Sequence, residues 1–407
     1  MKKIMLGLSV ACAAWCALAD PNDPQITKVG NPVQDYDRVL KVEYVLDEPA
    51  IVTFDVKTNG VSIGAENLKL AYGDVHRVVE AGTRTLFWPA YEAWPEHSSK
   101  RDGMNYSVTV TAWATNSPPD YMVIKLVGDD KGARTFYTAP EQLPGVGGVT
   151  NDLYKTDYLV MRRIPAAGKT FRMGSPASEP ARQSNEILHY VSLTNDFYMS
   201  IFELTQGQFK NVVGSEPTTY TSYSYEPTHP VDWLVYNSFR GSSKLWPGDG
   251  HDVDLSKNLY TFRTTLNLPT LDLPTEAEWE FACRAGTLTG RYNGTEYGAT
   301  VADIAWLGAG TTQPHAVGLL KPNSYGLYDM YGNVDEYCLD YFAADYAAEG
   351  STVIAPQGPS SGGTRVIRGT GSWWSSSGSQ ARSAFRQEYT ATGPWMCVGY
   401  RLVCTLK

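Results

Sequence analysis

Hydrophobic and polar positions alternate in short runs along the first quarter of the chain. Residues 39–46 and 51–56 are rich in β-branched side chains and partly alternating, and residues 104–113 alternate cleanly. A period of two is typical of strands with one buried face. The Asn59-Gly60 pair that follows the second run indicates a tight hairpin turn. No long helical period interrupts these runs, so residues 20–115 are predicted to form a small all-β sandwich.

Two helices are indicated further along the chain by the pattern of a capping box. This pattern places Ser or Thr three residues before Glu or Gln, and it occurs at Thr205 with Gln208 and at Thr275 with Glu278. Gly214 is placed to end the first helix. The second helix is predicted to run through Phe281, with Gly286 beyond its end.

A Pro-rich stretch separates these two parts of the chain. Residues 116–120 read Asn-Ser-Pro-Pro-Asp after a strand-like run, which is typical of a linker. Residues 121–407 are rich in Gly, Trp and Tyr and show few helical periods. They are predicted to form a second domain of loops and short strands.

Five motifs follow one another in this second part. They are Phe-Arg-Met-Gly-Ser at 171–175, Glu-Leu-Thr-Gln-Gly-Gln-Phe at 203–209, Leu-Pro-Thr-Glu-Ala-Glu-Trp-Glu-Phe-Ala-Cys-Arg-Ala-Gly at 273–286, the segment 321–337 around Tyr-Gly-Asn-Val-Asp-Glu-Tyr, and Arg-Gly-Thr-Gly-Ser-Trp-Trp with its continuation at 364–404. On these motifs, residues 121–407 resemble the formylglycine-generating enzyme, or sulfatase-modifying factor, family. The resemblance implies an α+β fold of the C-type-lectin-like kind with little regular secondary structure.

The chain departs from that family where the family does its chemistry. The enzymes carry two cysteines, five positions apart, just after the Gly-Ser-aromatic run. Here the two positions fall on Ser375 and Gln380. A thiolate is both the nucleophile and the soft-metal ligand, and neither a hydroxyl nor an amide replaces it. The resemblance therefore predicts the scaffold without the reaction, and copper is not expected.

The same resemblance implies one calcium site. The family holds the ion with side chains at the positions of Asp329 and Glu336 and with main-chain carbonyls at the positions of Gly332 and Val334. Calcium accepts such a mixture of hard oxygens. The alternative is a tight turn whose carboxylates cap main-chain amides. For the family's second calcium site, only Asp303-Ile304 matches, and only its first half.

The last motif carries arginines and an aromatic, hydroxyl-rich segment. Arg368, Arg382, Arg386 and Arg401 are expected to tie carbonyl-rich loops together, with contact to a substrate as the alternative. The predicted binding surface, called the 372–396 loop surface, takes its side chains from this segment: Trp373, Trp374, Ser375, Ser376, Ser377, Ser379, Gln380 and Tyr389. Such a mixture favours contact with a protein or a glycan. Core packing is the alternative for the aromatics.

Residues 1–19 have the charged start, short apolar run and Ala-Leu-Ala end of a secretory signal. A retained membrane anchor is the alternative, and no later stretch is long and apolar enough to span a membrane. The sequence thus predicts a secreted, periplasmic or cell-surface protein. Four cysteines would remain after cleavage, which permits two disulfides in three pairings or buried free thiols. They are Cys283, Cys338, Cys397 and Cys404.

The net charge is −9 for the whole chain, and an acidic chain repels phosphate backbones. Nucleic acid is therefore not an expected partner. The histidines lack metal-ligand spacing, and no other catalytic motif occurs.

Three functions remain. The first is a catalytically silent binding protein, and the second is an oxidoreductase of the formylglycine-generating type. The third, a case of the first, is a variable protein diversified by a retroelement, since such proteins share this fold.

Overall fold

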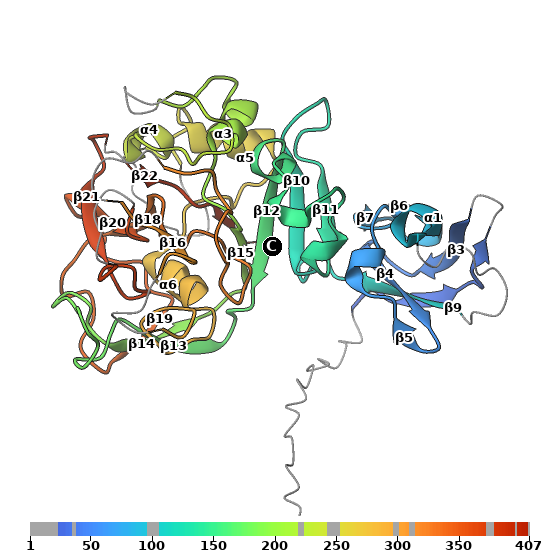
Figure 1. Ribbon diagram of the computed structural model, residues 1–407, viewed down its shortest axis with the longest axis horizontal. Helices are drawn as coiled ribbons and strands as arrows, with labels where there is room; N and C mark the ends of the chain where they lie inside the picture. The colour runs from blue at the N-terminus through green and yellow to red at the C-terminus, as the bar shows by residue number, and fades with distance from the viewer. Residues whose placement is uncertain are drawn as a thin grey trace, which may run out of the picture.

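The structure is a computed structural model of the 407-residue chain, and it describes residues 23–34, 38–95, 106–218, 224–241, 253–295, 301–308, 314–371, 378–394 and 397–405. Two parts lie side by side (Figure 1). We refer to residues 23–113 as the N-terminal region and to residues 121–405 as the C-terminal region. The predicted signal at 1–19 lies outside the described residues and stays a prediction.

The N-terminal region consists of two antiparallel sheets over one apolar core. The alternation predicted at 39–46 is visible in β3, where every second residue is buried. One sheet contains β1 (Ile26–Val29), β2 (Val33–Gln34), β3 (Val39–Leu46), β6 (Tyr72–Gly73) and β8 (Gly82–Pro89). The other contains β4 (Ala50–Thr58), β5 (Val61–Ser62), β7 (Val78–Val79) and β9 (Tyr106–Trp113). A short helix, α1 (Ala90–Ala93), follows β8.

The hairpin predicted at Asn59-Gly60 is confirmed. β4 and β5 pair antiparallel with Thr58 opposite Val61, so two residues form the turn. Asn59 and Gly60 have φ angles of 51° and 81°. Both central residues of such a turn need positive φ, which Asn and Gly adopt at low cost.

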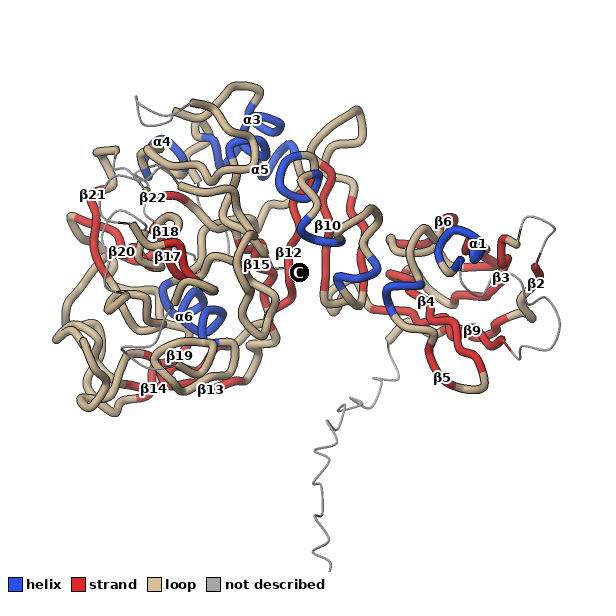
Figure 2. The backbone as a smooth tube through the Cα atoms, viewed as in Figure 1, coloured by secondary structure: helices blue, strands red, loops and turns tan. Residues whose placement is uncertain are grey.

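The described part of the C-terminal region contains four sheets of two to five strands among many loops (Figure 2). The first runs β11 (Arg134–Tyr137), β10 (Tyr121–Lys125), β12 (Tyr158–Ile164), β15 (Phe197–Ser200), β23 (Val403–Cys404). The second runs β13 (Lys169–Met173), β14 (His189–Leu193), β19 (Thr352–Ile354). The third pairs β16 (Ala305–Trp306) with β17 (Tyr331–Gly332), and the fourth runs β21 (Gln387–Thr390), β20 (Thr364–Arg368), β18 (Asp335–Tyr341), β22 (Val398–Gly399). The predicted α+β class with little regular structure is confirmed.

Both predicted capping boxes are present. Thr205 caps α3 (Gln206–Val213) and Thr275 caps α6 (Glu276–Arg284), each accepting from the amide three residues on. The second helix runs through Phe281 and has Gly286 beyond its end, as predicted; its last residue is Arg284, and Ala285 takes the left-handed conformation. The other helices of the described region are α2 (Leu153–Thr156), α4 (Tyr236–Phe239) and α5 (Asn258–Thr265).

The two regions contact each other where β11 lies beside β4. Ile51 belongs to the same apolar cluster as Met122 and Phe136. The Phe136 amide donates to the His76 carbonyl at 2.8 Å, and the His76 ring stacks on Tyr137. Residues 118–120 of the predicted linker are bonded to the C-terminal region, for example from Arg163 Nη1 to the Pro118 carbonyl at 2.9 Å. Within the described ranges, no helix has the length and apolar character needed to cross a membrane.

Candidate functional site

The four arginines that were expected to tie loops together, Arg368, Arg382, Arg386 and Arg401, are buried and hold the loops around the site. Their side chains are at most 2 % exposed. Arg382 pairs with Glu186 and Glu179, about two hundred positions earlier in the chain. Arg386 makes a bidentate pair with Glu276 at 2.6 and 2.7 Å and also donates to the Ala343 carbonyl. The expectation that these arginines tie carbonyl-rich loops together is confirmed.

Arg368 connects the start of α6 to the segment that follows Gln380. Its guanidinium pairs with Glu280 and Glu276 on α6 and donates to the carbonyls of Ser383 and Phe385. The guanidinium also lies over the ring of Trp279. Because each arginine has five N–H donors, one side chain satisfies several carbonyls that no strand ladder reaches.

The predicted calcium loop lies at the centre of this network. Glu336 pairs with Arg401 at 2.7 Å and accepts from the Trp279 indole at 2.6 Å. Asp329 accepts from the Gly318 amide through Oδ2 at 2.7 Å. Its Oδ1 is buried and has no hydrogen-bond partner among the described residues. Burial raises the pKa of Asp329 to about 6.

Sequence reasoning did not single out Glu203, which completes this cluster. Its carboxylate accepts from Asn333 Nδ2 at 2.6 Å and from the Val334 amide at 3.1 Å. Burial raises its pKa well above the ordinary value, and the nearby carboxylates of Asp329 and Glu336 raise it further. An acid between Phe202 and Leu204, in a run of apolar residues, was the signal that could have indicated it.

The buried charge of this cluster is negative, and both carboxylate oxygens of Glu336 already accept from Arg401. Three buried carboxylates face one guanidinium, that of Arg401, and one oxygen of Asp329 has no partner in the described part of the chain. An unpaired buried carboxylate oxygen is costly, and a hard cation would relieve that cost. No group of three or more metal-ligating side chains is arranged to hold an ion among the described residues. The predicted site does not need such a group, because it combines two carboxylates with the Gly332 and Val334 carbonyls.

Only part of the 372–396 loop surface lies in the described ranges. Trp373, Trp374, Ser375, Ser376 and Ser377 lie outside them, so their placement stays a prediction. Ser379 and Gln380 are half-buried, and the Ser379 carbonyl accepts from Arg382 Nε at 2.9 Å. Gln380 Oε1 is buried and makes no hydrogen bond to any described residue. Tyr389, on β21, is half-buried and packs against the apolar cluster that contains Tyr337.

Hydrogen bonds from two side chains fix the main chain around Gln380. Arg291 is buried and donates to the carbonyls of Gly378 and Ala381 at 2.9 and 3.1 Å. Thr370 Oγ1 donates to the Gln380 carbonyl at 2.8 Å. These bonds order the main chain on both sides of a glutamine whose side-chain oxygen has no partner among the described residues.

All four cysteines expected in the mature chain are buried, and none of them is in a disulfide. Of the two alternatives left by the sequence, the structure thus has buried thiols and not disulfides. Burial raises the pKa of Cys283 and of Cys404 to about 12, and that of Cys338 well above its usual range. A thiol that stays protonated is neither a nucleophile nor a ready metal ligand.

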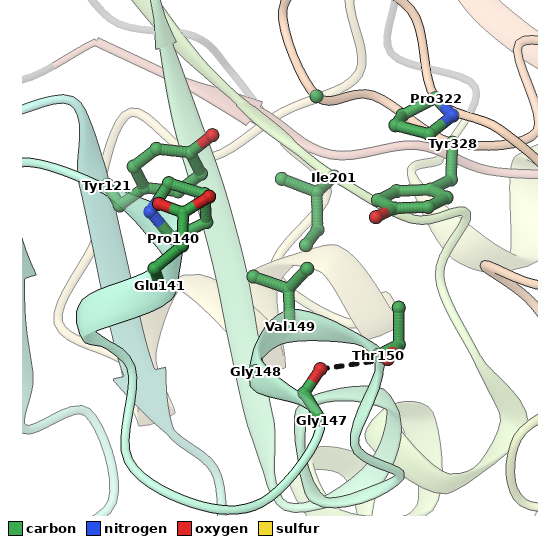
Figure 3. A pocket seen from close by; sticks show the side chains of 11 residues that line it. Tyr121, Pro140, Glu141, Gly147, Gly148, Val149, Thr150, Ile201, Pro322 and Tyr328 are labelled. Carbon is green, nitrogen blue, oxygen red and sulfur yellow. Dashed lines mark hydrogen bonds between the residues drawn. The ribbon is translucent and has the colours of Figure 1, made fainter. Parts of the chain in front are cut away.

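A cavity of about 330 Å³ lies next to the predicted calcium loop. Tyr121 and Tyr328 stand on opposite sides of it, with Ile201 and Val149 between them (Figure 3). Tyr328 immediately precedes Asp329, and its carbonyl accepts from Arg401 Nη2 at 2.8 Å. The network that surrounds the carboxylates therefore also fixes one wall of this cavity.

Two of the histidines in the described ranges have structural surroundings. His76 donates through Nδ1 to the Phe136 carbonyl, and His315 stacks on Trp306 with ring centroids 3.9 Å apart. Asp303 pairs with Lys321 at 3.1 Å near the surface. His97 and His251 lie outside the described residues.

Comparison with known proteins gives matches to the C-terminal region. A family model described as "Sulfatase-modifying factor enzyme 1-like domain" matches residues 160–406. The formylglycine-generating enzyme of Thermomonospora curvata is 41% identical over 112 residues, which are 24% of this chain and 37% of that one. The serine/threonine-protein kinase pkn1 of Chlamydia caviae is 41% identical over 198 residues, 48% of this chain and 31% of that one.

The chain spans between 16% and 37% of the length of the first curated relatives that it matches. Among solved structures, it is similar to Treponema denticola variable protein 1, with a TM-score of 0.48 and 24% identity. That match covers 64% of this chain and 98% of the other. These structural likenesses concern the fold alone.

Proposed function

Because this chain belongs to the sulfatase-modifying factor family, we propose that it is a secreted, catalytically silent member that binds a protein or a glycan through the 372–396 loop surface. The single observation that carries the proposal is the pair of residues at the family's two cysteine positions. Ser375 and Gln380 cannot form the dithiolate on which copper chemistry depends.

The surroundings of the remaining thiols support catalytic silence. Cys283 Sγ lies 3.7 Å from the Ser383 hydroxyl, and Cys404 Sγ lies 3.8 Å from the Met161 sulfur. Neither thiol is exposed, and both have raised pKa values. An oxidase with a rewired site would need a reachable thiolate, and neither of these cysteines supplies one.

Gln380 supports the binding half of the proposal. Its side-chain oxygen has no partner in the described part of the chain, while buried arginines hold the main chain around it. A backbone that is already ordered loses little conformational entropy when a ligand binds beside it. A variable protein diversified by a retroelement would use the same binding surface, but its residues would arise by targeted mutation of the gene. Adenine-rich codons at its variable positions and a nearby template copy would distinguish it.

The first experiment tests the missing reaction. A sulfatase-type cysteine peptide is incubated with the mature protein and copper and then measured by mass spectrometry. We expect no conversion of its cysteine to formylglycine. The Ser375→Cys/Gln380→Cys double variant, treated in the same way, tests whether the scaffold alone is competent. Conversion by the unmodified protein would establish the oxidoreductase alternative.

A second experiment tests the surface itself. The protein is screened against glycan arrays and secreted proteins, and the Trp374→Ala/Tyr389→Ala variant is then compared on each ligand that is found. We expect this variant to lose binding with a nearly unchanged melting curve. Tyr72→Ala, an exposed aromatic on β6, is the matched control and should retain binding. If the double variant unfolds instead, these aromatics belong to the core.

We also propose that calcium binds at Asp329, Gly332, Val334 and Glu336. When bound, the ion would supply positive charge to a cluster of three buried carboxylates. A ligand that binds only the folded state stabilises it by about 2.7 kcal/mol at a hundredfold excess over its Kd. Melts in calcium and in chelator should therefore differ, and Asp329→Asn should abolish the difference. Glu216→Gln, at a half-exposed acid, should leave it intact. Identical melts for the unmodified protein would reject the site.

A further inference from the structure

A cavity of about 460 Å³ opens between β13, β14 and the C-terminal end of α6, and it shares no residue with the 372–396 loop surface. Its floor is aromatic. Phe171 on β13 meets Phe281 on α6 edge-on, with ring centroids 5.2 Å apart, and Phe281 in turn lies 6.3 Å from the ring of Tyr325. The opening has two further apolar side chains, Tyr190 and Leu288, which are 43% and 69% exposed. A floor of this kind binds apolar ligands.

The charge around this cavity has one sign. Lys169, Arg172 and Arg284 line it, and its lining includes no aspartate or glutamate, although the chain as a whole has a net charge of −9. Arg284 is buried and already paired with Glu280 at 2.7 Å, so its charge is balanced. In the described part of the chain, the side chains of Lys169 and Arg172 make no ion pair and no hydrogen bond. Two cations without a partner among the described residues thus line the cavity, Lys169 from the face of β13 that carries Phe171 and Arg172 from the opposite face.

Lys169 and Arg172 belong to a strand, β13, whose backbone is fixed by its pairing with β14. β13 is an edge strand of its sheet, paired on one side with β14 through Lys169–Leu193 to Met173–His189. Figure 1 shows α6 close above this sheet, and Phe171 is fixed against Phe281 of that helix. Lysine on an edge strand also discourages pairing with other chains. That role does not explain why a half-buried arginine, Arg172, lines the same cavity without a partner among the described residues.

We propose that this cavity binds a small amphipathic carboxylate, with its aryl or alkyl body on the Phe171–Phe281–Tyr325 floor and its carboxylate at Arg172 and Lys169. An arginine can bind a carboxylate through two parallel N–H donors. The volume suits a ligand of one or two rings. This site does not depend on the proposed function of the 372–396 loop surface, and it can be present in a binding protein or in an enzyme.

The test uses three probes of one shape and different charge: naphthoate, naphthamide and naphthylmethylammonium. Their affinities for the full mature chain are measured by calorimetry and by ligand-observed NMR. We expect naphthoate to bind about tenfold more tightly than the amide, the ratio that one charge-assisted hydrogen bond supplies. The ammonium probe should bind most weakly. Equal affinities, a preference for the ammonium probe or no binding of naphthoate would overturn the proposal.

Variants separate charge from apolar contact. Arg172→Gln should weaken naphthoate about tenfold and leave the amide unchanged. Lys169→Gln, at an exposed position, repeats this test if Arg172→Gln is poorly folded. Leu288→Ser should weaken both probes, and Lys131→Gln, a remote exposed lysine, should weaken neither. If naphthoate binds Arg172→Gln and Lys169→Gln as tightly as the unmodified chain, this carboxylate site is wrong.

Discussion

The two regions of this protein fill their interiors with different kinds of side chain. In the N-terminal region, the buried residues are apolar except for Thr53 and His76 among those described. In the C-terminal region, Arg240, Arg291 and Arg401 are among the largest fully buried side chains. Ion pairs in the described part of the N-terminal region lie at the surface, whereas most of the arginine pairs described above have no exposed partner.

The difference follows from the way each region satisfies its main-chain groups. The strands of the N-terminal region bond to one another along ladders such as β3 with β8 and β4 with β9. Much of the C-terminal region is loop, and loop carbonyls have no ladder (Figure 2). Buried carbonyls need donors, and arginines provide several from one side chain. In this region, arginines and their carboxylates perform the task that strand pairing performs in the other.

The largest expected effect comes from removing one charge of the buried network. Asp272 accepts from Arg240 at 2.8 and 2.9 Å and from Arg263 at 3.0 Å, and it is fully buried. Asp272→Asn keeps the shape but leaves two buried guanidiniums without a counter-charge. We expect the free energy of unfolding to fall by about 3–5 kcal/mol in urea titrations.

Its control is an ion pair of the N-terminal region. Lys41 and Glu43 pair at 2.9 Å with both side chains about half exposed. Glu43→Gln should produce no measurable change in the same titration, because solvent screens such a pair. Similar effects of Asp272→Asn and Glu43→Gln would show that the contrast between the two interiors has no energetic meaning.

The next effect concerns His76, a buried histidine of the N-terminal region. His76 lies between Phe54 and Tyr137, at the junction of the two regions, and its nearest charged neighbour in sequence, Arg77, is exposed and pairs with Asp74. Burial lowers the pKa of His76 to about 4, so the unfolded chain binds a proton at higher pH than the folded chain does. Stability is therefore lost as pH falls from about 6.5 to about 4, by on the order of 3 kcal/mol.

The measurement is chemical denaturation of the unmodified protein and of His76→Asn across this pH window. Asparagine tolerates the positive φ of 59° at this position and does not titrate. The difference in unfolding free energy between the two proteins should shrink as pH falls, since only the unmodified one loses the histidine contribution. A constant difference from pH 6.5 to pH 4 would contradict the burial argument.

The sequence predicted the N-terminal region better than the C-terminal region. The N-terminal region is built from strands with local patterns, whereas the C-terminal region depends on ion pairs between residues far apart in the chain. β3 has the predicted limits, and the Asn59-Gly60 turn is where it was expected, because alternation and turn chemistry are local. β8 was not predicted: its first half reads Gly-Thr-Arg-Thr, with no buried face until Leu86. Its pairing with β3 supplies what the local pattern lacks.

In the C-terminal region, the partners that define the site lie far apart in the chain. Nothing near Arg382 indicates that Glu186 will neutralise it, and the cavity beside Arg172 depends on α6, about a hundred residues later. The resemblance to the family predicted the fold and the structural role of the arginines, because both follow from motifs that this chain shares with the family. It did not indicate Glu203 or the charge around the β13 cavity, which only the packed chain brings together.

The smallest expected effect is at the C-terminal ends of α3 and α6, two helices of the C-terminal region that begin at a capping threonine. α3 ends at Gly214 with φ 86°, and α6 ends at Ala285 with φ 45°. A Cβ at Gly214 would meet nothing within 4 Å, so Gly214→Ala adds no clash and only the strain of a left-handed side chain. That strain costs about 1 kcal/mol.

Ala285→Gly should relieve the same strain at α6 but lose the packing of a methyl group that is 9% exposed. We therefore expect its unfolding free energy to rise by less than Gly214→Ala lowers it. Thermal melts of the two variants should move in opposite directions. If the melting temperatures of both variants fall, the packing of the Ala285 side chain outweighs the strain of its backbone at the end of α6.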